Sequence, residues 1–377
     1  MRVLFAAHHE ASTGGAQRAL LDLAPRLARA GMTIHVTAPR DGDLLSRARA
    51  AGLETHVIDS PWWLTTASPA HRSHSQAIVN AVRTAHGRWR ALLAAVAPDA
   101  VVTCTIAHPT PAFAATTLGI PHLWWIQEFG EIDHDLQFVF GERQTLALVG
   151  LLSAKVLACS NAVRDRLIGA GLPPATVATW YYGISVATCH PPRQDDGRLQ
   201  LLQLGRISES KGTHVAIAAV RAAIGMGSNC WLRIVGAQSR EERVHLHVQL
   251  ERLGLADRVQ VLPWSDDLDR AIAEADVILV PSRCEAFGRV TVEALRRGRP
   301  VVACRSGGSP ELIAHKRNGW LFTPWGAPAL AELLAEIGAD RRQLALCTAA
   351  ASSSIADRFL PDEQNGKFVS ALKEIVL

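Results

Sequence analysis

Short apolar runs alternate with longer amphipathic stretches along the whole chain. In the stretch before Gly31, Ala16, Leu20, Leu23 and Leu27 recur at helical spacing and fall on one face. Strands that alternate with such helices predict parallel sheets covered on both faces, an α/β fold. The predicted strands are 3–7, 33–37, 55–58, 100–103, 123–127 and 156–158, followed by 199–204, 232–235, 259–262, 277–280 and 301–303.

The alternation breaks once, between Ser185 and Gly197, where proline and polar residues replace the periodic pattern. We interpret this segment as a linker between two Rossmann-like, doubly wound domains, 1–186 and 197–359. A last helix at about 360–377 has Phe368, Leu372 and Ile375 at helical spacing. It could pack on either domain, including back on the first.

The charge pattern excludes some classes of function. The 377 residues carry 39 Lys and Arg against 35 Asp and Glu, a net charge of +4, without a basic tail, which disfavours nucleic acid as a partner. Seven cysteines without a C-x-x-C pair predict reduced thiols in the cytoplasm and no zinc cluster. Because no apolar stretch reaches about 18 residues, a soluble chain is expected, with peripheral contact at the inner face of a membrane left open.

One helix raises the membrane alternative directly. Over residues 76–93, Arg83, Arg88 and Arg90 lie beside Trp89. However, Trp89 continues an apolar stripe at helical spacing, so we interpret Trp89 as a core residue and the arginines as the solvated face.

The strongest chemical pattern follows the strand at 199–204. Residues 205–212, GRISESKG, place glycines at both ends of a strand-to-helix turn, with Arg206 and Lys211 between them. A helix N-terminus with two cations suits a diphosphate, although an exposed loop with unrelated charges has the same appearance. Only five lysines occur in the chain, so Lys211 stands out. The loop does not match a Walker sequence.

Two acids follow the strand at 277–280. Glu285 lies in the loop at its carboxyl end, where open α/β sheets bind ligands, and Glu293 lies over one turn inside the next helix. Carboxylates accept hydrogen bonds from vicinal hydroxyls, so one could hold a sugar and the other a ribose. The alternative is an acid favoured by the helix dipole and a surface acid in mid-helix.

Two further glycine-rich turns complete the pattern. The segment 305–311, RSGGSPE, again joins a strand to a helix. Two glycine-rich strand ends and one acid-bearing strand end in one half-chain suggest a single nucleotide-sugar site. Near the N-terminus, Gly14 and Gly15 would let the backbone approach a phosphate or a second substrate. The G-x-G-x-x-G fingerprint is missing there, which counts against a dehydrogenase.

Taken in order, these motifs resemble the retaining glycosyltransferases of family 4, over nearly the whole chain. The matching segments are 14–18, 205–212, 281–288, 293–294, 298–302, 307–311 and 318–319, and Glu285 and Glu293 correspond to the family's E-x7-E pair. The resemblance implies the GT-B fold, with two Rossmann-like domains facing a central cleft. It further implies an enzyme of polysaccharide biosynthesis or a related pathway.

The resemblance also implies roles for single residues. Arg206, Lys211 and Glu285 would be catalytic, with both cations on the donor diphosphate and Glu285 on the donor hexose. Gly205, Gly15, Ala286 and the backbone N–H groups of Phe287 and Gly288 would line the donor, Glu293 would bind the ribose, and Gly236 and Trp264 would lie near the base. Gly14 and Gln127 would belong to the acceptor or sugar side.

One position departs from the family. Many relatives place a histidine at the end of the fifth strand of the first domain, whereas this chain has Gln127. An amide donates a hydrogen bond but cannot act as an acid or base. His108, His122 and His134 lie nearby in sequence, and we interpret each of them as structural.

The predicted function is transfer of a hexose, with retention, from a UDP- or GDP-sugar to a hydroxyl of a glycan, a lipid-linked or a small-molecule acceptor. No cofactor or metal is expected, and the Asp-x-Asp matches at 41–43, 133–135 and 267–269 are interpreted as chance. The alternatives are a catalytically inactive binding module and a nucleotide-sugar epimerase of the same fold. Trp62, Trp63, Trp124 and Trp125 either line the acceptor side or pack in the core.

Overall fold

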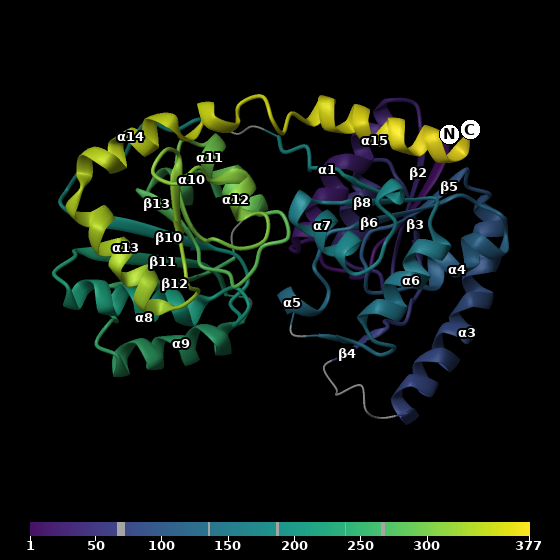
Figure 1. Cartoon of the computed structure of the whole chain (residues 1–377), viewed down its shortest axis with the longest axis horizontal. Coiled ribbons are helices and arrows are strands. Elements are labelled where there is room, and N and C mark those ends of the chain that lie inside the picture. The colour runs from purple at the N-terminus through teal and green to yellow at the C-terminus, as the bar shows by residue number, and fades with distance from the viewer. Residues whose placement is uncertain (66–71, 135, 186–187, 238, 265–267) are drawn as a thin grey trace. The chain divides into compact units, whose positions relative to one another are not determined.

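The chain forms two compact units (Figure 1). The structure is a computed structural model that describes residues 1–377 except 66–71, 135, 186–187, 238 and 265–267, and it leaves the side chains of 72–74, 133–134 and 237 undescribed. Unit 1 comprises Met1–Ser185 and Phe359–Leu377, and unit 2 comprises Val186–Arg358. Each unit is built around one parallel sheet, which confirms the predicted α/β class.

Unit 1 holds a seven-stranded parallel sheet in the order β3-β2-β1-β5-β6-β8-β9. Its central strands β1, β5 and β6 are almost entirely buried, so their Val, Leu and Trp side chains form the core on both faces. A two-stranded antiparallel pair, β4-β7, adjoins it. The strands are β1 Arg2–Ala6, β2 Thr33–Ala38, β3 Glu54–Val57, β4 Leu64–Thr65, β5 Ala100–Thr103, β6 His122–Ile126, β7 Gln137–Phe138, β8 Lys155–Ala158 and β9 Val177–Thr179.

Helices cover both faces of this sheet (Figure 1). They are α1 Gly15–Arg29, α2 Asp43–Ala50, α3 Arg72–Val96, α4 Thr110–Thr117, α5 Glu131–His134, α6 Glu142–Leu152 and α7 Asn161–Gly169, with a short 3₁₀ turn at Pro174–Thr176. On α3, Trp89 is fully buried, whereas Arg83, Arg88 and Arg90 are exposed. The interpretation of Trp89 as a core residue is therefore confirmed.

The last helix, α15 Pro361–Val376, packs on unit 1 beside α1 (Figure 1). Phe368 is fully buried there, with its ring 6.0 Å from that of Phe5 in β1 and 4.8 Å from that of Trp180. The indole nitrogen of Trp180 donates to the carbonyl of Gln364 at 2.7 Å. The chain therefore returns to unit 1 after completing unit 2.

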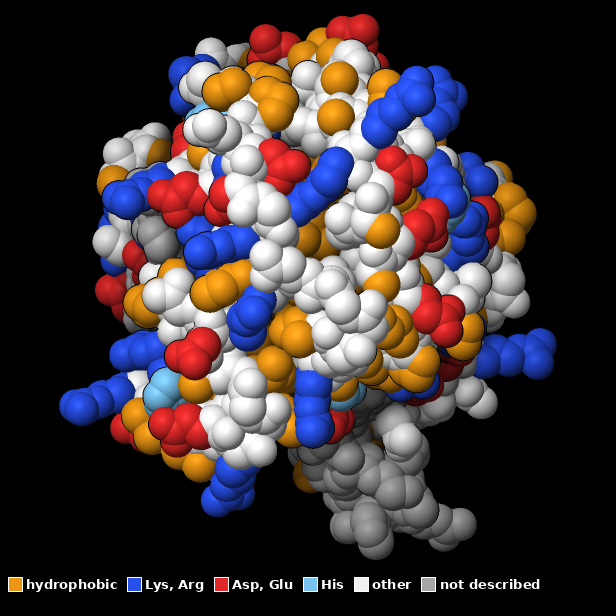
Figure 2. Space-filling view, turned by 90° about the vertical axis from the view of Figure 1, so that its left-hand side faces the viewer, with side chains coloured by type: hydrophobic (Ala, Val, Ile, Leu, Met, Phe, Trp, Pro, Cys, Tyr) orange, Lys and Arg blue, Asp and Glu red, His pale blue; other side chains and the backbone are white. Residues whose placement is uncertain are grey.

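Unit 2 holds a six-stranded parallel sheet in the order β12-β11-β10-β13-β14-β15. Its strands are β10 Leu199–Leu204, β11 Cys230–Ala237, β12 Val259–Pro263, β13 Val277–Val280, β14 Val301–Cys304 and β15 Gly319–Phe322. Its helices are α8 Thr213–Gly225, α9 Arg240–Arg252, α10 Leu268–Ala273, α11 Arg289–Arg296, α12 Ser309–Leu312, α13 Ala327–Ala339 and α14 Arg341–Ala351, with a 3₁₀ turn at Ser353–Ile355. On the face shown in Figure 2, acidic and basic side chains are interspersed.

All eleven predicted strands are present, most with ends shifted by one or two residues. Four strands, β4, β7, β9 and β15, were not predicted. β4 and β7 have two residues each, β9 has three, and β15 begins at a glycine, so none of them carries a long β-rich apolar run.

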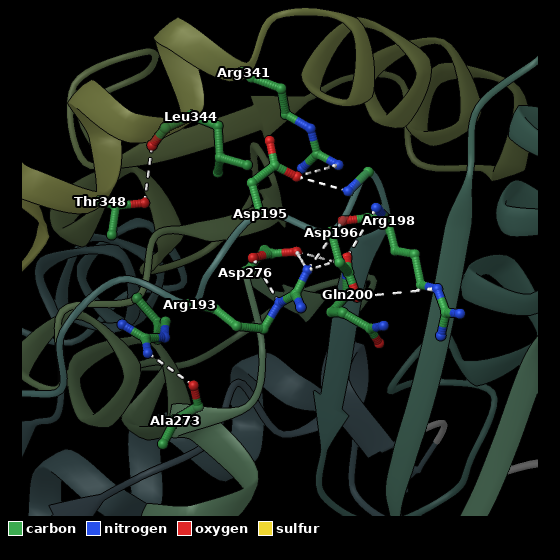
Figure 3. Close-up of polar contacts among 12 residues, drawn as sticks. Arg193, Asp195, Asp196, Arg198, Gln200, Ala273, Asp276, Arg341, Leu344 and Thr348 are labelled. Carbon is green, nitrogen blue, oxygen red and sulfur yellow. Dashed lines mark hydrogen bonds and ion pairs between the residues drawn. The ribbon is translucent and has the colours of Figure 1, made fainter.

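Residues 188–197 of the predicted linker contain no helix or strand and belong to unit 2, whose other residues hold them by hydrogen bonds and ion pairs (Figure 3). Arg193 pairs with Asp276, Nε to Oδ1, at 3.1 Å, and with Asp196 at 2.7 Å. The pairs with Asp196 and Asp276 raise the pKa of the Arg193 guanidinium. The hydrogen bond from Arg193 lowers the pKa of the Asp196 carboxyl to about 2. Arg299 is almost fully buried and donates to the carbonyls of Pro191 at 2.7 Å and Ala273 at 2.8 Å.

Buried histidines predict that acid destabilises unit 1. Burial lowers the pKa values of His108 and His122 to about 3, so both are neutral in the folded chain. In the unfolded chain they take up protons below about pH 6.5, so stability is complete above that pH and is lost as the pH falls. Each of the two histidines should lower the free energy of unfolding by about 1 kcal/mol at pH 5.5. Urea titrations followed by tryptophan fluorescence at pH 7.5 and 5.5 measure this, and equal free energies of unfolding would contradict it.

Candidate functional site

The predicted donor residues of unit 2 lie at the carboxyl edge of its sheet. From β10 the chain proceeds to β11 and β12 on one side, while β13, β14 and β15 lie on the other. The point between β10 and β13 is therefore the topological switch point, where open α/β sheets bind ligands. The loop with Arg206 and Lys211 follows β10, and the loop with Glu285 follows β13.

The two loops are packed backbone against backbone. Gly212 has φ +68°, which favours glycine, and a Cβ added there would lie 2.1 Å from the carbonyl oxygen of Pro281. The amide of Arg283 donates to the carbonyl of Ser210 at 3.0 Å, and the indole of Trp325 donates to that of Pro281 at 2.8 Å. Glycine at 212 is thus required by close approach as well as by its dihedral angle.

This packing places Lys211 against Glu285. The Lys211 ammonium lies 2.7 Å from Glu285 Oε1, and the Ser282 hydroxyl donates to the same oxygen at 2.6 Å. The Lys211 side chain is 36% exposed and that of Glu285 15%, so both are partly open to solvent. The structure therefore brings the cation of one loop and the acid of the other into direct contact.

The third glycine-rich turn supports the backbone of Glu285. The amide of Gly308 donates to the Glu285 carbonyl at 2.7 Å. Gly307, with φ +54°, approaches so closely that a Cβ would lie 2.2 Å from the same oxygen. Ala286 and Phe287 are buried, and Gly288 begins α11 in a left-handed conformation.

Glu293 is a buried residue, which overturns the alternative that it is a surface acid. Its side chain is only 8% exposed and accepts a hydrogen bond from Arg289 Nε at 2.8 Å, one helical turn earlier.

Arg206 is the second cation predicted for the donor diphosphate. It lies in the β10–α8 loop, and its side chain is exposed to solvent.

Two more predicted residues share this edge. The amide of Gly205 donates to the carbonyl of Val235. Gly236 lies against the carbonyl of Gly205, and a Cβ added at Gly236 would lie 1.8 Å from that oxygen. Trp264 follows β12 and is half-buried. Because β11 pairs with both β10 and β12, the backbone brings the strand ends that carry Gly205, Gly236 and Trp264 together. Their roles toward a nucleotide stay predictions.

At the carboxyl edge of unit 1, Gly14 and Gly15 begin α1, and Gln127 follows β6. Gly14 lies against the Gln17 side chain, whereas nothing lies within 4 Å of a Cβ at Gly15. The roles of these glycines toward a ligand stay predictions. Gln127 is buried, and its Nε2 donates to the carbonyl of Cys104 at 2.9 Å.

Sequence reasoning missed the buried carboxylate next to Gln127. Glu128 accepts hydrogen bonds from the Thr105 hydroxyl, the amide of Ile106 and the amide of Gln127. Its carboxylate thus links the end of β6 to the loop that follows β5. Ser282 and Arg289 were also missed; the spacing of Arg289 and Glu293, i to i+4, is the signal that could have found that pair.

Other candidates are engaged in the fold. His108 bonds Ser60 at 2.8 Å and His122 bonds Thr103 at 2.8 Å, which confirms a structural role for each. The carboxylate of Asp43 accepts a hydrogen bond from the Ser12 hydroxyl and forms an ion pair with Arg47. Asp135 and Asp267 lie outside the described residues, as does the side chain of His134.

Two features are absent from the part of the chain that the structure describes. The described residues contain no group of three His, Cys, Asp or Glu side chains suited to a metal ion. Among them there is also no helix that combines the length and the apolar character needed to cross a bilayer.

Two family models together match most of both units. The model for family 4 glycosyltransferases matches residues 13–188, and the model for group 1 glycosyl transferases matches residues 190–353. The chain belongs to the family 4 glycosyltransferases. This confirms the resemblance found in the motifs.

Curated relatives match over parts of the chain. The putative colanic acid biosynthesis glycosyltransferase WcaL of Salmonella typhimurium is 29% identical over 231 residues, which cover 58% of this chain. The D-inositol 3-phosphate glycosyltransferase of Mycobacteroides abscessus is 36% identical over 168 residues, covering 42% of this chain and 37% of the relative. The chain spans 56% of the length of WcaL, about half.

Solved structures match over nearly the whole length. Anabaena Alr3699/HepE, solved in complex with UDP, is 23% identical, with a TM-score of 0.76 over 99% of this chain and all of that protein. At this identity the match shows the fold, which is GT-B.

The close packing at Gly212 is testable with a matched glycine. Gly227, at the other end of α8, has φ +91° but no atom within 4 Å of a Cβ. Both Gly212→Ala and Gly227→Ala should lower the free energy of unfolding by about 1–2 kcal/mol, because alanine is strained in the left-handed conformation. Only Gly212→Ala must also move the Pro281 carbonyl, which should cost about 1–3 kcal/mol more. Chemical denaturation of the two variants measures the difference, and equal losses would refute the close contact.

Proposed function

We propose that this protein is a retaining hexosyltransferase that moves a hexose from a UDP- or GDP-sugar to a hydroxyl of a glycan, lipid-linked or small-molecule acceptor. The observation that carries the proposal is the Lys211–Glu285 contact at the switch point of unit 2, where both loops are held by backbone packing. A partly exposed cation and acid at this edge suit a ligand with both phosphates and hydroxyls.

The donor would bind with its diphosphate at the β10–α8 loop. Arg206 and Lys211 supply two cations there, and the N-terminus of α8 adds backbone N–H groups. Negative charge grows on the diphosphate as the sugar–phosphate bond breaks, and cations already in place stabilise that charge. A phosphate oxygen would replace Glu285 Oε1 as a partner of Lys211, leaving Glu285 to accept hydrogen bonds from hexose hydroxyls.

Glu293 would hold the nucleotide ribose. It is buried and held by Arg289, and a carboxylate held in this way could accept hydrogen bonds from two vicinal hydroxyls. Gly236 and Trp264 would border the base. Because Anabaena HepE was solved with UDP and with UDP-glucose, uridine donors are the first to test.

Retention would follow from reaction on one face of the sugar. The bond between the anomeric carbon and the phosphate oxygen breaks, a bond to the acceptor oxygen forms on the same face, and the acceptor proton passes to the leaving phosphate. This route needs no protein base, which agrees with an amide at Gln127. We propose that it needs no metal, since the cations of the loop serve the diphosphate.

The polysaccharide assignment rests on relatives. WcaL is described as a putative colanic acid biosynthesis glycosyltransferase and AmsK of Erwinia amylovora as an amylovoran biosynthesis glycosyltransferase. We propose a related role, with a glycan or glycolipid acceptor, in the cytoplasm.

A panel of UDP-, GDP- and ADP-sugars tests donor binding by thermal unfolding. A ligand at 100 times its Kd should add about 2.7 kcal/mol, enough to raise the melting temperature by several degrees. Lys211→Ala should abolish most of this shift and lower turnover at least about 100-fold. Lys367→Ala is the matched control, because Lys367 also pairs with a glutamate, Glu363, at 2.6 Å, on α15. No shift with any sugar nucleotide would refute the proposal.

The stereochemistry and the metal requirement can be read from one reaction. Proton NMR of the first product should show the anomeric configuration of the donor sugar. Excess EDTA should leave the rate unchanged, since no metal takes part in the proposed chemistry. An inverted product would exclude the same-face mechanism, and loss of activity restored by a divalent ion would exclude metal independence.

A further inference from the structure

Unit 1 has its own topological switch point. From β1 the chain proceeds to β2 and β3 on one side of the sheet, and β5, β6, β8 and β9 lie on the other. The ends of β1 and β5 therefore border a crevice of the kind that holds ligands in open α/β sheets. In unit 2 the corresponding point carries the charged residues of the donor site.

An exposed tryptophan lies at this point. Of the ten tryptophans, all of which the structure describes, Trp62 alone is exposed, with 36% of its surface accessible. Its ring lies 5.7 Å from that of His8, the second residue after β1, in an edge-to-face arrangement. The indole thus lies at the carboxyl end of β1. Single apolar side chains at other places on a protein surface are common, but this one lies at a switch point where ligands bind.

The backbone on both sides of Trp62 is fixed. The Ser60 hydroxyl bonds His108 at 2.8 Å, and the amide of Trp63 donates to the carbonyl of Ala107, beyond β5, at 3.0 Å. The Trp63 carbonyl accepts from Val139 at 2.9 Å, and its buried ring stacks on that of Trp124 at 5.8 Å. The chain therefore holds Trp62 at the surface while its neighbour anchors the segment in the core.

The His8 imidazole borders the indole and is itself in contact with an amide. His8 Nε2 lies 3.3 Å from Nε2 of Gln17, which is buried in the first turn of α1. Gln17 in turn contacts the Gly14 position. An aromatic face with an imidazole at its edge matches a pyranose ring, which has C–H groups on its faces and hydroxyls around its rim.

We propose that Trp62 is the platform on which a sugar ring of the acceptor lies, with His8, which Gln17 contacts from behind, bordering its hydroxyls. This rests on the proposed function, because it assigns the acceptor class of the same enzyme. A sugar fits better than an alkyl chain, since an alkyl chain would cover the half-buried His8 imidazole without giving hydrogen bonds in return. Trp63, Trp124 and Trp125, which were the other candidates for the acceptor side, are core residues.

Fluorine NMR of protein labelled with 5-fluorotryptophan tests the platform directly. The Trp62 resonance is the one that Trp62→Phe removes. With UDP present, the methyl α-glycosides of glucose, galactose and mannose are added separately at millimolar concentrations, and 1,2-hexanediol serves as the apolar probe. At least one glycoside should shift the Trp62 line, and hexanediol should not. No shift with any glycoside, or an equal shift with hexanediol, would overturn the proposal.

Kinetics then separate a binding role from a structural one. With a glycoside that shifts the line as acceptor, Trp62→Ala should raise its KM about tenfold or more, and Trp62→Phe should restore most of the affinity. The thermal shift with the donor should stay as in the wild type. Trp231→Ala, in the half-buried position at the start of β11, is the matched control. If Trp62→Ala leaves the acceptor KM unchanged and donor binding is normal, the platform alone is refuted. If the wild-type protein binds no sugar nucleotide at all, the proposed function is refuted.

Discussion

Close approach of backbone at the carboxyl edge of unit 2 is the constraint on which the rest of the site depends. The carbonyl of Pro281 occupies the space that any side chain at Gly212 would need, and the carbonyl of Glu285 occupies that needed at Gly307. Three loops from β10, β13 and β14 can therefore meet with little room between them. Because each backbone is held by its neighbours, the side chains of Lys211 and Glu285 start from fixed positions.

The ion pair between these residues serves geometry more than stability. Both side chains are partly exposed, and exposed pairs contribute about 0–1 kcal/mol. The Ser282 hydroxyl, which is buried, donates to the same carboxylate oxygen and adds a charge-assisted hydrogen bond whose donor carries no net charge. Glu285 thus keeps one partner within its own loop when Lys211 turns toward a phosphate.

The sequence was sufficient for the parallel sheets and for the loops of unit 2, because long apolar strands and glycine-bracketed turns are local signals. The strands β9 and β15 were missed, since β9 has only three residues and β15 begins at a glycine, so neither carries a long apolar run. Spacing could not show that Glu293 is buried or that Ser282 shares an oxygen with Lys211. Those facts depend on contacts between loops far apart in the chain, over 70 residues for Lys211 and Glu285.

The two switch points differ in chemistry, and the difference suits two kinds of ligand. That of unit 2 presents cations and carboxylates. That of unit 1 presents an indole, an imidazole and amides, and its buried histidines His108 and His122 are neutral because burial lowers their pKa values. The carboxylate of Glu128 is occupied by the hydroxyl and amides that it ties together. In the reaction that we propose, the leaving phosphate of the donor accepts the proton of the incoming hydroxyl, so unit 2 supplies the charged groups and unit 1 recognises a neutral sugar.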